Sequence, residues 1–219
     1  MIECIGMSKV YGSGHTRVQA LAPTDFKARA GEFVAIVGPS GSGKTTLLTL
    51  LGQLQAPTTG EIFFKGQETS QWSEKKRAKL RLNDLGFILQ SSNLIPYLKV
   101  EEQLKLMDRL SKKEKVDAEE LLRDLDLLDM AQAYPKDLSG GERQRAAIAR
   151  ALYHQPDLIL ADEPTASLDT ERALAVVHLL GKAAREDGKT VIMITHDTRL
   201  LDQVDSVYRM EDGMLTKEG

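Results

Sequence analysis

The chain of 219 residues contains one cysteine, Cys4, and aromatic residues make up only 5% of it. A single cysteine cannot form a disulfide within the chain, which is typical of proteins from a reducing compartment. No apolar run approaches the roughly 20 residues that a membrane-crossing helix needs. Residues 1–6 do not have the pattern of a signal peptide. We therefore expect no direct insertion into a membrane.

Positive charge is not in excess either. The chain has 29 lysines and arginines against 32 aspartates and glutamates, a formal net charge of −3. Without a long basic run, the sequence lacks the electrostatic footprint of a nucleic-acid-binding protein, so we expect no nucleic-acid partner. We interpret the short basic stretch 75–79 as a solvated helix face. The length suits one hydrophobic core with at most one attached subdomain.

A glycine-rich loop, GPSGSGKTT at residues 38–46, stands between an apolar strand pattern at 33–37 and a helical run at 47–51. Its three glycines allow backbone N–H groups to turn toward a polyphosphate, and the following helix adds the positive end of its dipole. In such a loop Lys44 reaches the β- and γ-phosphates and the Thr45 hydroxyl ligates Mg²⁺. The alternative is a plain linker, but the order strand, loop and helix favours a phosphate-binding P-loop.

Two adjacent carboxylates, Asp162 and Glu163, follow the apolar strand pattern 158–161. Ligand-binding groups of open α/β sheets gather at the carboxyl ends of strands. Asp162 is suited to the Mg²⁺ shell, and Glu163 to positioning or deprotonating a water aimed at the γ-phosphate. An acidic turn without function is the alternative, and it fits poorly with a P-loop in the same chain.

Residues 139–142, Ser-Gly-Gly-Glu, have the spacing of a capping box, which is a routine helix start. The two glycines weaken that first turn, but they also expose backbone N–H groups to an anion. His196 follows the strand pattern 190–195. If that strand lies beside 158–161, His196 can contact a γ-phosphate.

The remaining pattern predicts an α/β chain with a helical insertion. Further strands are expected at 2–5, 24–28, 61–65 and 85–89, and helices at 100–133, 139–153 and 170–186. We interpret the apolar stripe of Leu121, Leu122, Leu125 and Leu128 as packing. The segment 91–98 reads as a loop, although it carries Leu94, Ile95, Tyr97 and Leu98.

Together these motifs resemble the nucleotide-binding subunit of an ABC transporter, and the resemblance covers the chain almost end to end. It implies an α/β fold with a P-loop NTPase (RecA-like) core, an antiparallel β subdomain and an inserted α-helical subdomain. One ABC ATPase domain would span residues 1–219. Within it, residues 1–90 and 155–219 would form the core and β subdomain, and residues 91–154 the helical subdomain.

The resemblance also assigns roles residue by residue. Catalysis is implied for Glu163, His196 and Lys44, and Mg²⁺ binding for Thr45, Gln90 and Asp162. The residues implied to bind ATP are Tyr11, Gly38, Ser40, Gly41, Ser42, Gly43, Lys44, Thr45, Thr46, Gln90, Ser139, Gly140, Gly141, Glu142, Asp169 and His196. In family terms, Tyr11 stacks on adenine, Gln90 is the Q-loop glutamine and Asp169 the D-loop aspartate. Residues 138–142 (LSGGE) are the signature.

Within the family, residues 161–169 (ADEPTASLD) resemble the macrolide-exporter and lipoprotein-releasing branch. Residues 85–104 resemble the ATPase subunits of bacterial haem exporters of the Hrt type. The resemblance implies an ATP-hydrolysing homodimer at the cytoplasmic face of the cell membrane. It would power an FtsX/MacB-like permease, of the HrtB type, that exports haem. The segment from Ser91 to Leu98 would contact the permease.

Three other functions remain open at this point. The same ATPase could drive export of a lipophilic drug or peptide, or serve a non-transporting cell-division or signalling complex. A soluble ABC ATPase of DNA repair or chromosome structure fits less well, because such proteins carry a long coiled-coil or zinc insertion. Only a few residues follow the pattern at 207–213, so we expect no added regulatory domain.

Overall fold

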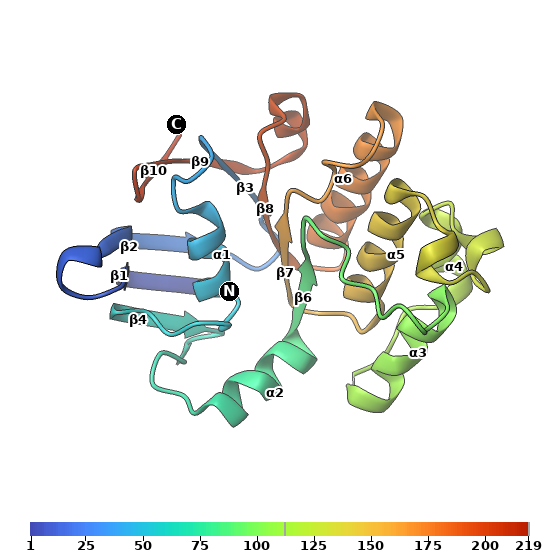
Figure 1. Ribbon diagram of the computed structural model, residues 1–219, viewed down its shortest axis with the longest axis horizontal. Helices are drawn as coiled ribbons and strands as arrows, with labels where there is room; N and C mark the ends of the chain where they lie inside the picture. Colours follow the sequence, from blue (N-terminus) through green and yellow to red (C-terminus); the bar gives the residue numbers. More distant parts are fainter. Residues whose placement is uncertain (112, 219) are drawn as a thin grey trace.

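Two β-sheets of different kinds organise the chain (Figure 1). A six-stranded sheet has the order β10-β9-β3-β8-β7-β6 and is parallel except for the terminal strand β10. A second, antiparallel sheet has the order β2-β1-β4-β5. The structure, a computed structural model, describes residues 1–111 and 113–218. Lys112 and Gly219, which the predicted domain includes, lie outside the described residues.

The elements follow one another as a mixed α/β chain. The strands are β1 (Ile2–Tyr11), β2 (Val18–Ala28), β3 (Phe33–Val37), β4 (Thr59–Phe64), β5 (Gln67–Glu68), β6 (Leu85–Ile88), β7 (Leu158–Asp162), β8 (Thr190–Ile194), β9 (Ser206–Glu211) and β10 (Met214–Lys217). The α-helices are α1 (Lys44–Leu51), α2 (Glu74–Asp84), α3 (Val100–Leu110), α4 (Ala118–Asp124), α5 (Gly140–Tyr153) and α6 (Thr170–Arg185). Short 3₁₀ turns lie at Gly14–Thr16, Leu128–Met130, Pro135–Asp137 and Thr198–Gln203.

Most predicted elements are present, with two corrections. The first two strands are longer than expected, because β1 extends to Tyr11 and β2 begins at Val18. Their alternation is interrupted by shifts in register between Cys4 and Val10, which hides the strand period from the sequence. The predicted helical stretch 100–133 is not continuous, since α3 ends at Leu110 and α4 begins at Ala118.

The central strands are buried on both faces, as their unbroken apolar runs require. In β8, Val191 and Met193 face one hydrophobic cluster, while Ile192 and Ile194 face the other. The same alternation holds in β7, where Ile159 packs on the first cluster. The period of two along a strand therefore distributes each run over two separate cores.

Helix α1 fills the space between the two sheets (Figure 1). Its four leucines, Leu47, Leu48, Leu50 and Leu51, are at most 1% exposed. They pack in one cluster with residues of β1, β2 and β4 and of the parallel sheet. Because the P-loop leads directly into α1, this packing fixes the loop against the sheet edge.

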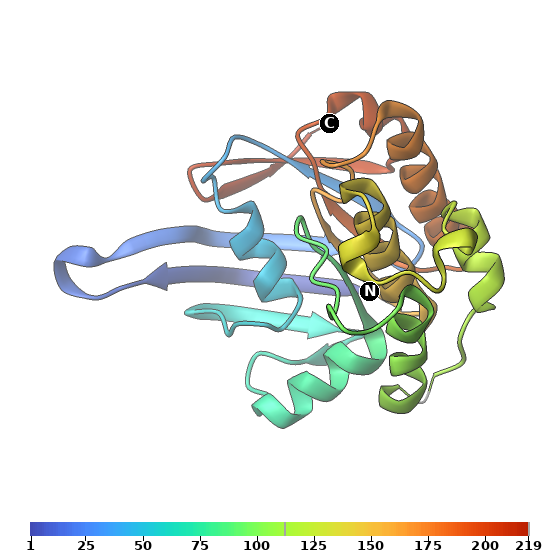
Figure 2. The same ribbon diagram turned by 45° about the vertical axis from the view of Figure 1, so that its right-hand side comes forward.

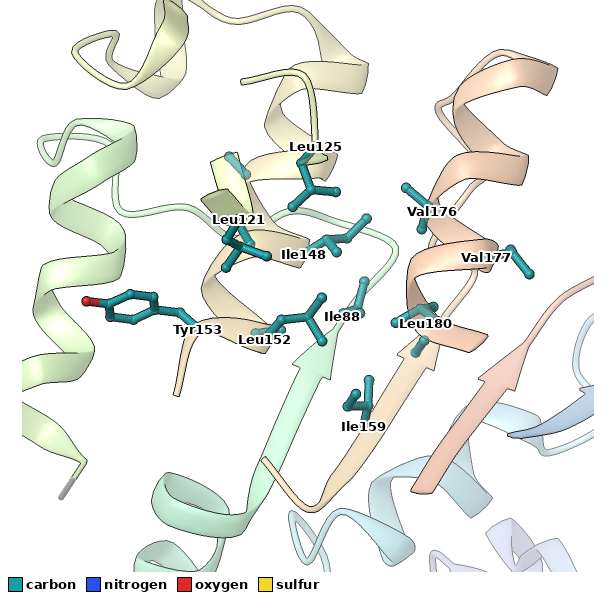
Figure 3. Close-up of a cluster of buried hydrophobic side chains, with 14 of the residues drawn as sticks. Ile88, Leu121, Leu125, Ile148, Leu152, Tyr153, Ile159, Val176, Val177 and Leu180 are labelled. Carbon is teal, nitrogen blue, oxygen red and sulfur yellow. The ribbon is translucent and has the colours of Figure 1, made fainter. Parts of the chain in front are cut away.

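Helices α5 and α6 cover the other face of the parallel sheet, and α3 and α4 lie beyond α5 (Figure 2). Figure 3 shows Leu121 and Leu125 pointing toward Ile148 of α5, as the apolar stripe predicted. Leu128 differs, because it lies past the end of α4 in the turn Leu128–Met130 and is 36% exposed. Packing is thus the role of the first three stripe residues.

Four charged side chains join segments that are distant in sequence. Lys65 Nζ lies 2.8 Å from Asp157 Oδ2 and 3.5 Å from Asp84 Oδ1. Lys113 Nζ pairs with the same two carboxylates. Burial alone would raise the pKa of Asp157, but hydrogen bonds from Lys113 and Lys65 outweigh it and lower the pKa to about 2. The cluster ties the β4–β5 turn and the α3–α4 connection to the start of β7.

His154, at the end of α5, makes stability depend on pH. It is 3% exposed, its Nε2 lies 3.2 Å from the Leu85 carbonyl oxygen, and its Nδ1 has no partner among the described residues. Burial lowers the pKa of His154 in the folded chain. As the pH falls below about 6.5, the imidazole is therefore protonated in the unfolded chain before it is protonated in the folded chain. The resulting stability is full above that pH and is lost as the pH falls, with a slope of at most about 1.4 kcal/mol per pH unit.

We predict that His154→Gln reduces the loss of unfolding free energy between pH 7 and pH 5, measured by urea denaturation. Glutamine keeps a donor for the Leu85 carbonyl but does not titrate. The exposed His15→Gln serves as a control and should retain the wild-type slope. An unchanged slope in His154→Gln would mean that this histidine is not the titrating group.

Candidate nucleotide-binding site

The predicted site residues meet where three neighbouring parallel strands end. The loop 38–46 follows β3, Asp162 ends β7, and His196 comes two residues after β8. Because β8 lies between β3 and β7, all three ends face the same edge of the sheet. Two backbone hydrogen bonds close this edge: Thr195 N donates to Ile36 O, and Glu163 N donates to Ile194 O at 3.0 Å.

At two positions of the loop a neighbouring backbone carbonyl lies so close that only glycine fits. Gly38 has φ 149°, and a Cβ there would stand 2.0 Å from the Met210 carbonyl oxygen. Gly43 has φ 106°, and its Cβ would stand 2.4 Å from the Ala20 carbonyl oxygen. Gly43 is also the N-cap of α1 and offers no side-chain cap, which leaves the first N–H groups of α1 available for an anion.

Lys44 lies along the loop that precedes it. Its ammonium group donates to the carbonyl oxygens of Gly38 at 2.8 Å and Pro39 at 2.7 Å. The buried Ser42 hydroxyl, 4% exposed, has no hydrogen-bond partner among the described residues. A buried hydroxyl without a partner costs free energy. A loop with a cation, exposed N–H groups and an unpaired hydroxyl fits a polyphosphate.

The expected Mg²⁺ ligands Thr45 and Asp162 are in contact. The Thr45 hydroxyl donates to Asp162 Oδ2 at 3.1 Å. Burial raises the pKa of Asp162, and the Thr45 hydrogen bond acts against that rise. The described residues contain no group of three or more histidine, cysteine, aspartate or glutamate side chains able to hold a metal. Two protein oxygens nevertheless fit Mg²⁺, which is usually held by one or two protein ligands together with phosphates and water.

Glu163 and His196 form a pair beside this position. His196 Nδ1 lies 2.7 Å from Glu163 Oε2, with the Glu163 side chain 16% exposed and that of His196 73% exposed. Glu163 also has φ 50°, a left-handed conformation that is unfavourable for a residue other than glycine. Such local strain is found at functional sites held by their surroundings. A fixed carboxylate next to an imidazole can position a water and accept its proton.

The signature residues form the capping box that the sequence predicted. The Ser139 hydroxyl accepts from Glu142 N at 3.2 Å, and Glu142 Oε2 accepts from Ser139 N at 2.7 Å. These hydrogen bonds lower the pKa of Glu142. A Cβ on Gly141 would stand 3.3 Å from the side chain of Leu168, so the signature packs against the residue that precedes Asp169. No hydrogen bond or ion pair between described residues joins residues 139–142 to the loop 38–46.

Three other predicted site residues have contacts of their own. Asp169 caps α6 by accepting from Arg172 N at 2.9 Å. The Tyr11 hydroxyl donates to Gln55 Oε1 at 2.8 Å, and its ring is partly exposed. Gln90 is exposed after β6. The structure thus brings Lys44, Thr45, Asp162, Glu163 and His196 to one edge, whereas the hydrogen bonds of Tyr11 and of the signature are made with residues outside that edge.

Sequence reasoning missed the polar side chains that hold these segments. Gln144 donates to Leu89 O at 3.1 Å, directly before Gln90. Arg172 bridges Asp169 and Asp126. Arg145, almost buried, donates to Leu125 O at 2.7 Å. Gln144 and Arg145 were visible in the sequence after the signature, but their partners come from other elements, so no local pattern reveals them.

The ABC transporter family matches residues 21–166. The chain belongs to this family. The predicted fold class is confirmed, since a solved cassette, MJ0796 in a dimeric post-hydrolysis state with ADP and Pi, has a TM-score of 0.93 and 36% identity. That similarity covers 100% of this chain and 98% of the other. As an ABC transporter ATPase subunit, the chain hydrolyses ATP.

The similarity to curated relatives extends over nearly the whole chain. A protein of Staphylococcus haemolyticus named hemin import ATP-binding protein HrtA is 43% identical, covering 95% of this chain and 96% of its own length. Proteins of the same name from Staphylococcus saprophyticus and Staphylococcus aureus are 44% and 45% identical, with similar coverage. A further solved structure, described as a dimeric bacterial ABC transporter cassette, again gives a TM-score of 0.93.

We predict that Glu163→Gln binds ATP but hydrolyses it about 10²–10⁴-fold more slowly, because the amide cannot accept a proton. Lys44→Ala should instead lose ATP binding, because it removes the cation that meets the phosphates. Titration with a fluorescent ATP analogue and a phosphate-release assay measure the two effects. Glu171→Gln, an exposed carboxylate on the first turn of α6, is the matched control. Near-normal turnover by Glu163→Gln would exclude it as the base.

Proposed function

We propose that this ABC ATPase powers a separate membrane permease and that the cargo is haem. The observation that carries the cargo is the 43–45% identity to proteins whose names include hemin. The resemblance of residues 85–104 to haem exporter ATPases supports the same assignment. The names of the relatives say import, whereas the resemblance implies export; we propose export, and the experiment below separates the two directions.

The ATPase works as a head-to-tail homodimer in this proposal. Each ATP lies between the loop 38–46 of one subunit and residues 139–141 of the other, an isologous pairing in which one surface serves twice. Two observations support it: the similar solved cassettes are described as dimeric, and the signature makes no hydrogen bond to the P-loop of its own chain. ATP binding closes the dimer and hydrolysis reopens it.

Within each site the chain's own residues divide the work. Lys44 and the N–H groups at the start of α1 hold the phosphates, and Tyr11 packs against adenine. Thr45 and Asp162, with Gln90, hold Mg²⁺, which neutralises charge on the β- and γ-phosphates when bound. Glu163 accepts the proton of the attacking water. His196, 2.7 Å from Glu163, keeps that carboxylate oriented and contacts the γ-phosphate.

Membrane attachment is provided by the permease. Among residues 1–111 and 113–218, no helix combines the length and the apolar composition needed to cross a bilayer. We propose, from the match to the ABC transporter family, that the chain lies at the cytoplasmic face of the cell membrane, bound to a permease of the FtsX/MacB-like, HrtB type.

The docking surface differs in part from the four-residue apolar cluster predicted at 91–98. Leu94 packs against the core, and Ile95 and Leu98 are half-buried, so only Tyr97 is widely exposed, at 76%. A hollow of about 350 Å³ lies between α2, β6, α3 and α5, and one of its lining residues, Arg150, donates to carbonyl oxygens of the segment 91–98. Its apolar lining includes Leu54, Leu82, Leu85, Phe87 and Met107. We propose that a cytoplasmic helix of the permease occupies this hollow and contacts Tyr97.

We predict that the signature acts in trans. Gly141→Asp places a negative charge where the partner's γ-phosphate should sit, and Gly141→Ala adds the same Cβ without charge. Mixing Gly141→Asp with Lys44→Ala chains should restore one intact site in each heterodimer, giving ATPase activity that neither parent shows. Purification through two different tags, one on each chain, removes both homodimers before the ATPase activity is measured. Inactivity of such heterodimers would contradict the head-to-tail arrangement.

Cellular haem tolerance tests the cargo and the docking surface. Deletion of the gene should make cells sensitive to haem if the transporter exports it. If it imports haem, deletion should instead abolish growth on haem as the iron source. Ile95→Asp/Tyr97→Asp should keep ATP binding but behave like the deletion, because a charged surface no longer accepts the permease helix. Tyr97→Phe is the matched control.

These outcomes are separable. A deletion strain with normal haem tolerance and normal haem use would exclude haem as the cargo without affecting the ATPase assignment. Full haem resistance in the double variant would exclude the docking surface without affecting the cargo.

A further inference from the structure

One helix, α5, holds the main chain on both sides of Gln90. Before Gln90, the Gln144 amide donates to Leu89 O at 3.1 Å. After it, the Arg150 guanidinium donates from Nη1 to Asn93 O at 2.8 Å and from Nη2 to Ser92 O at 3.2 Å. The helix that begins with the signature therefore holds the chain both before and after the residue expected to contact Mg²⁺.

Arg150 makes this contact as a partly buried cation without an acidic partner among the described residues. No aspartate or glutamate among the described residues forms an ion pair with it, although its surroundings are buried enough to lower its pKa. A partly buried cation without a counter-ion is costly unless hydrogen bonds compensate it. Its planar fork can hold two successive carbonyl oxygens at once, which a lysine ammonium does less well. The contact is therefore specific to the geometry of Ser92 and Asn93.

The rest of the segment has little freedom of its own. Asn93 adopts a left-handed φ of 45°. Gln103 of α3, which is fully buried, donates to the carbonyl oxygens of Ile95 and Leu98 and accepts from Ile95 N. Residues 91–98 are thus fastened to α3 and α5 by side chains rather than held by a regular element. Releasing one fastening should free the chain next to Gln90.

Arg150 also lines the hollow of about 350 Å³, together with Phe87 and Met107. The same residue therefore lines the proposed docking hollow and, through its guanidinium, holds the chain that follows Gln90. A helix that enters the hollow and shifts Arg150 would shift the carbonyl groups of Ser92 and Asn93 with it.

We propose that Arg150 is a positioning residue: it fixes Gln90 relative to the signature helix and links Gln90 to the docking hollow. The first half concerns ATP hydrolysis alone and does not depend on the cargo. The link to the hollow rests on the proposed function, because it requires a permease helix at that position.

The first half is tested with the purified chain. Arg150→Gln should lower kcat about 10- to 100-fold, as small misplacements of positioned groups do, with KM for ATP changed less than about twofold. Arg150→Lys should recover part of the rate, since one ammonium can still reach a carbonyl. Arg123→Gln, which removes an exposed guanidinium on α4, is the matched control and should retain wild-type kinetics.

Hydrogen exchange gives a readout that general destabilisation would not reproduce. The amides of Ile95 and Leu98 are hydrogen-bonded, and their exchange should rise about tenfold or more in Arg150→Gln, while β3 and β8 stay protected. Gln144→Met should also lower kcat. Its effect should be less than additive with Arg150→Gln, because both act on the chain around Gln90.

Three outcomes would overturn the proposal. One is a normal kcat in Arg150→Gln. Another is increased exchange across the whole sheet, which would show a structural role only. The third is strict additivity of the Gln144 and Arg150 variants. None of these depends on haem or on the permease, so failure here is distinguishable from failure of the proposed function.

Discussion

The parallel register of β3, β8 and β7 is the constraint on which the site depends. Ile36 and Asp162 both pair with Ile194, so the three strands end at the same level. The register is held because each strand buries apolar side chains on both faces, at about 1.5–3 kcal/mol for each large side chain. A slip by one residue would exchange the faces of a whole strand.

That register turns a sheet edge into a chemical site. It brings the Thr45 hydroxyl to 3.1 Å from Asp162 and His196 to 2.7 Å from Glu163, although these residues are distant in sequence. The same edge contains the left-handed Glu163 and the two glycines that lie against neighbouring carbonyl oxygens. Packing of α1 between the two sheets holds the glycine loop in its conformation, because the loop cannot relax without moving four buried leucines.

Helix α5 connects this edge with the rest of the molecule. Its first turn is the signature, and further along it Gln144 and Arg150 reach the chain around Gln90. The helix also packs against the parallel sheet and against α3 and α4 (Figure 3). A displacement of α5 would therefore change the signature and Gln90 together. This physical connection is what a transporter ATPase needs, since ATP occupancy and permease position must affect one another.

The sequence by itself determined the fold class, the P-loop and the identity of the chemical groups. These follow from local patterns: apolar runs that only a buried parallel strand explains, glycines before Lys44, and Asp162 and Glu163 at a strand end. Only the tertiary structure decided which of these groups touch. Thr45 pairs with Asp162, and Arg150 donates to the carbonyl oxygens of Ser92 and Asn93; both contacts join distant segments. Packing against distant helices likewise partly buries Leu94 and leaves Tyr97 exposed. Such contacts arise from strand order and helix packing, so they cannot be predicted from the periodicity of the sequence.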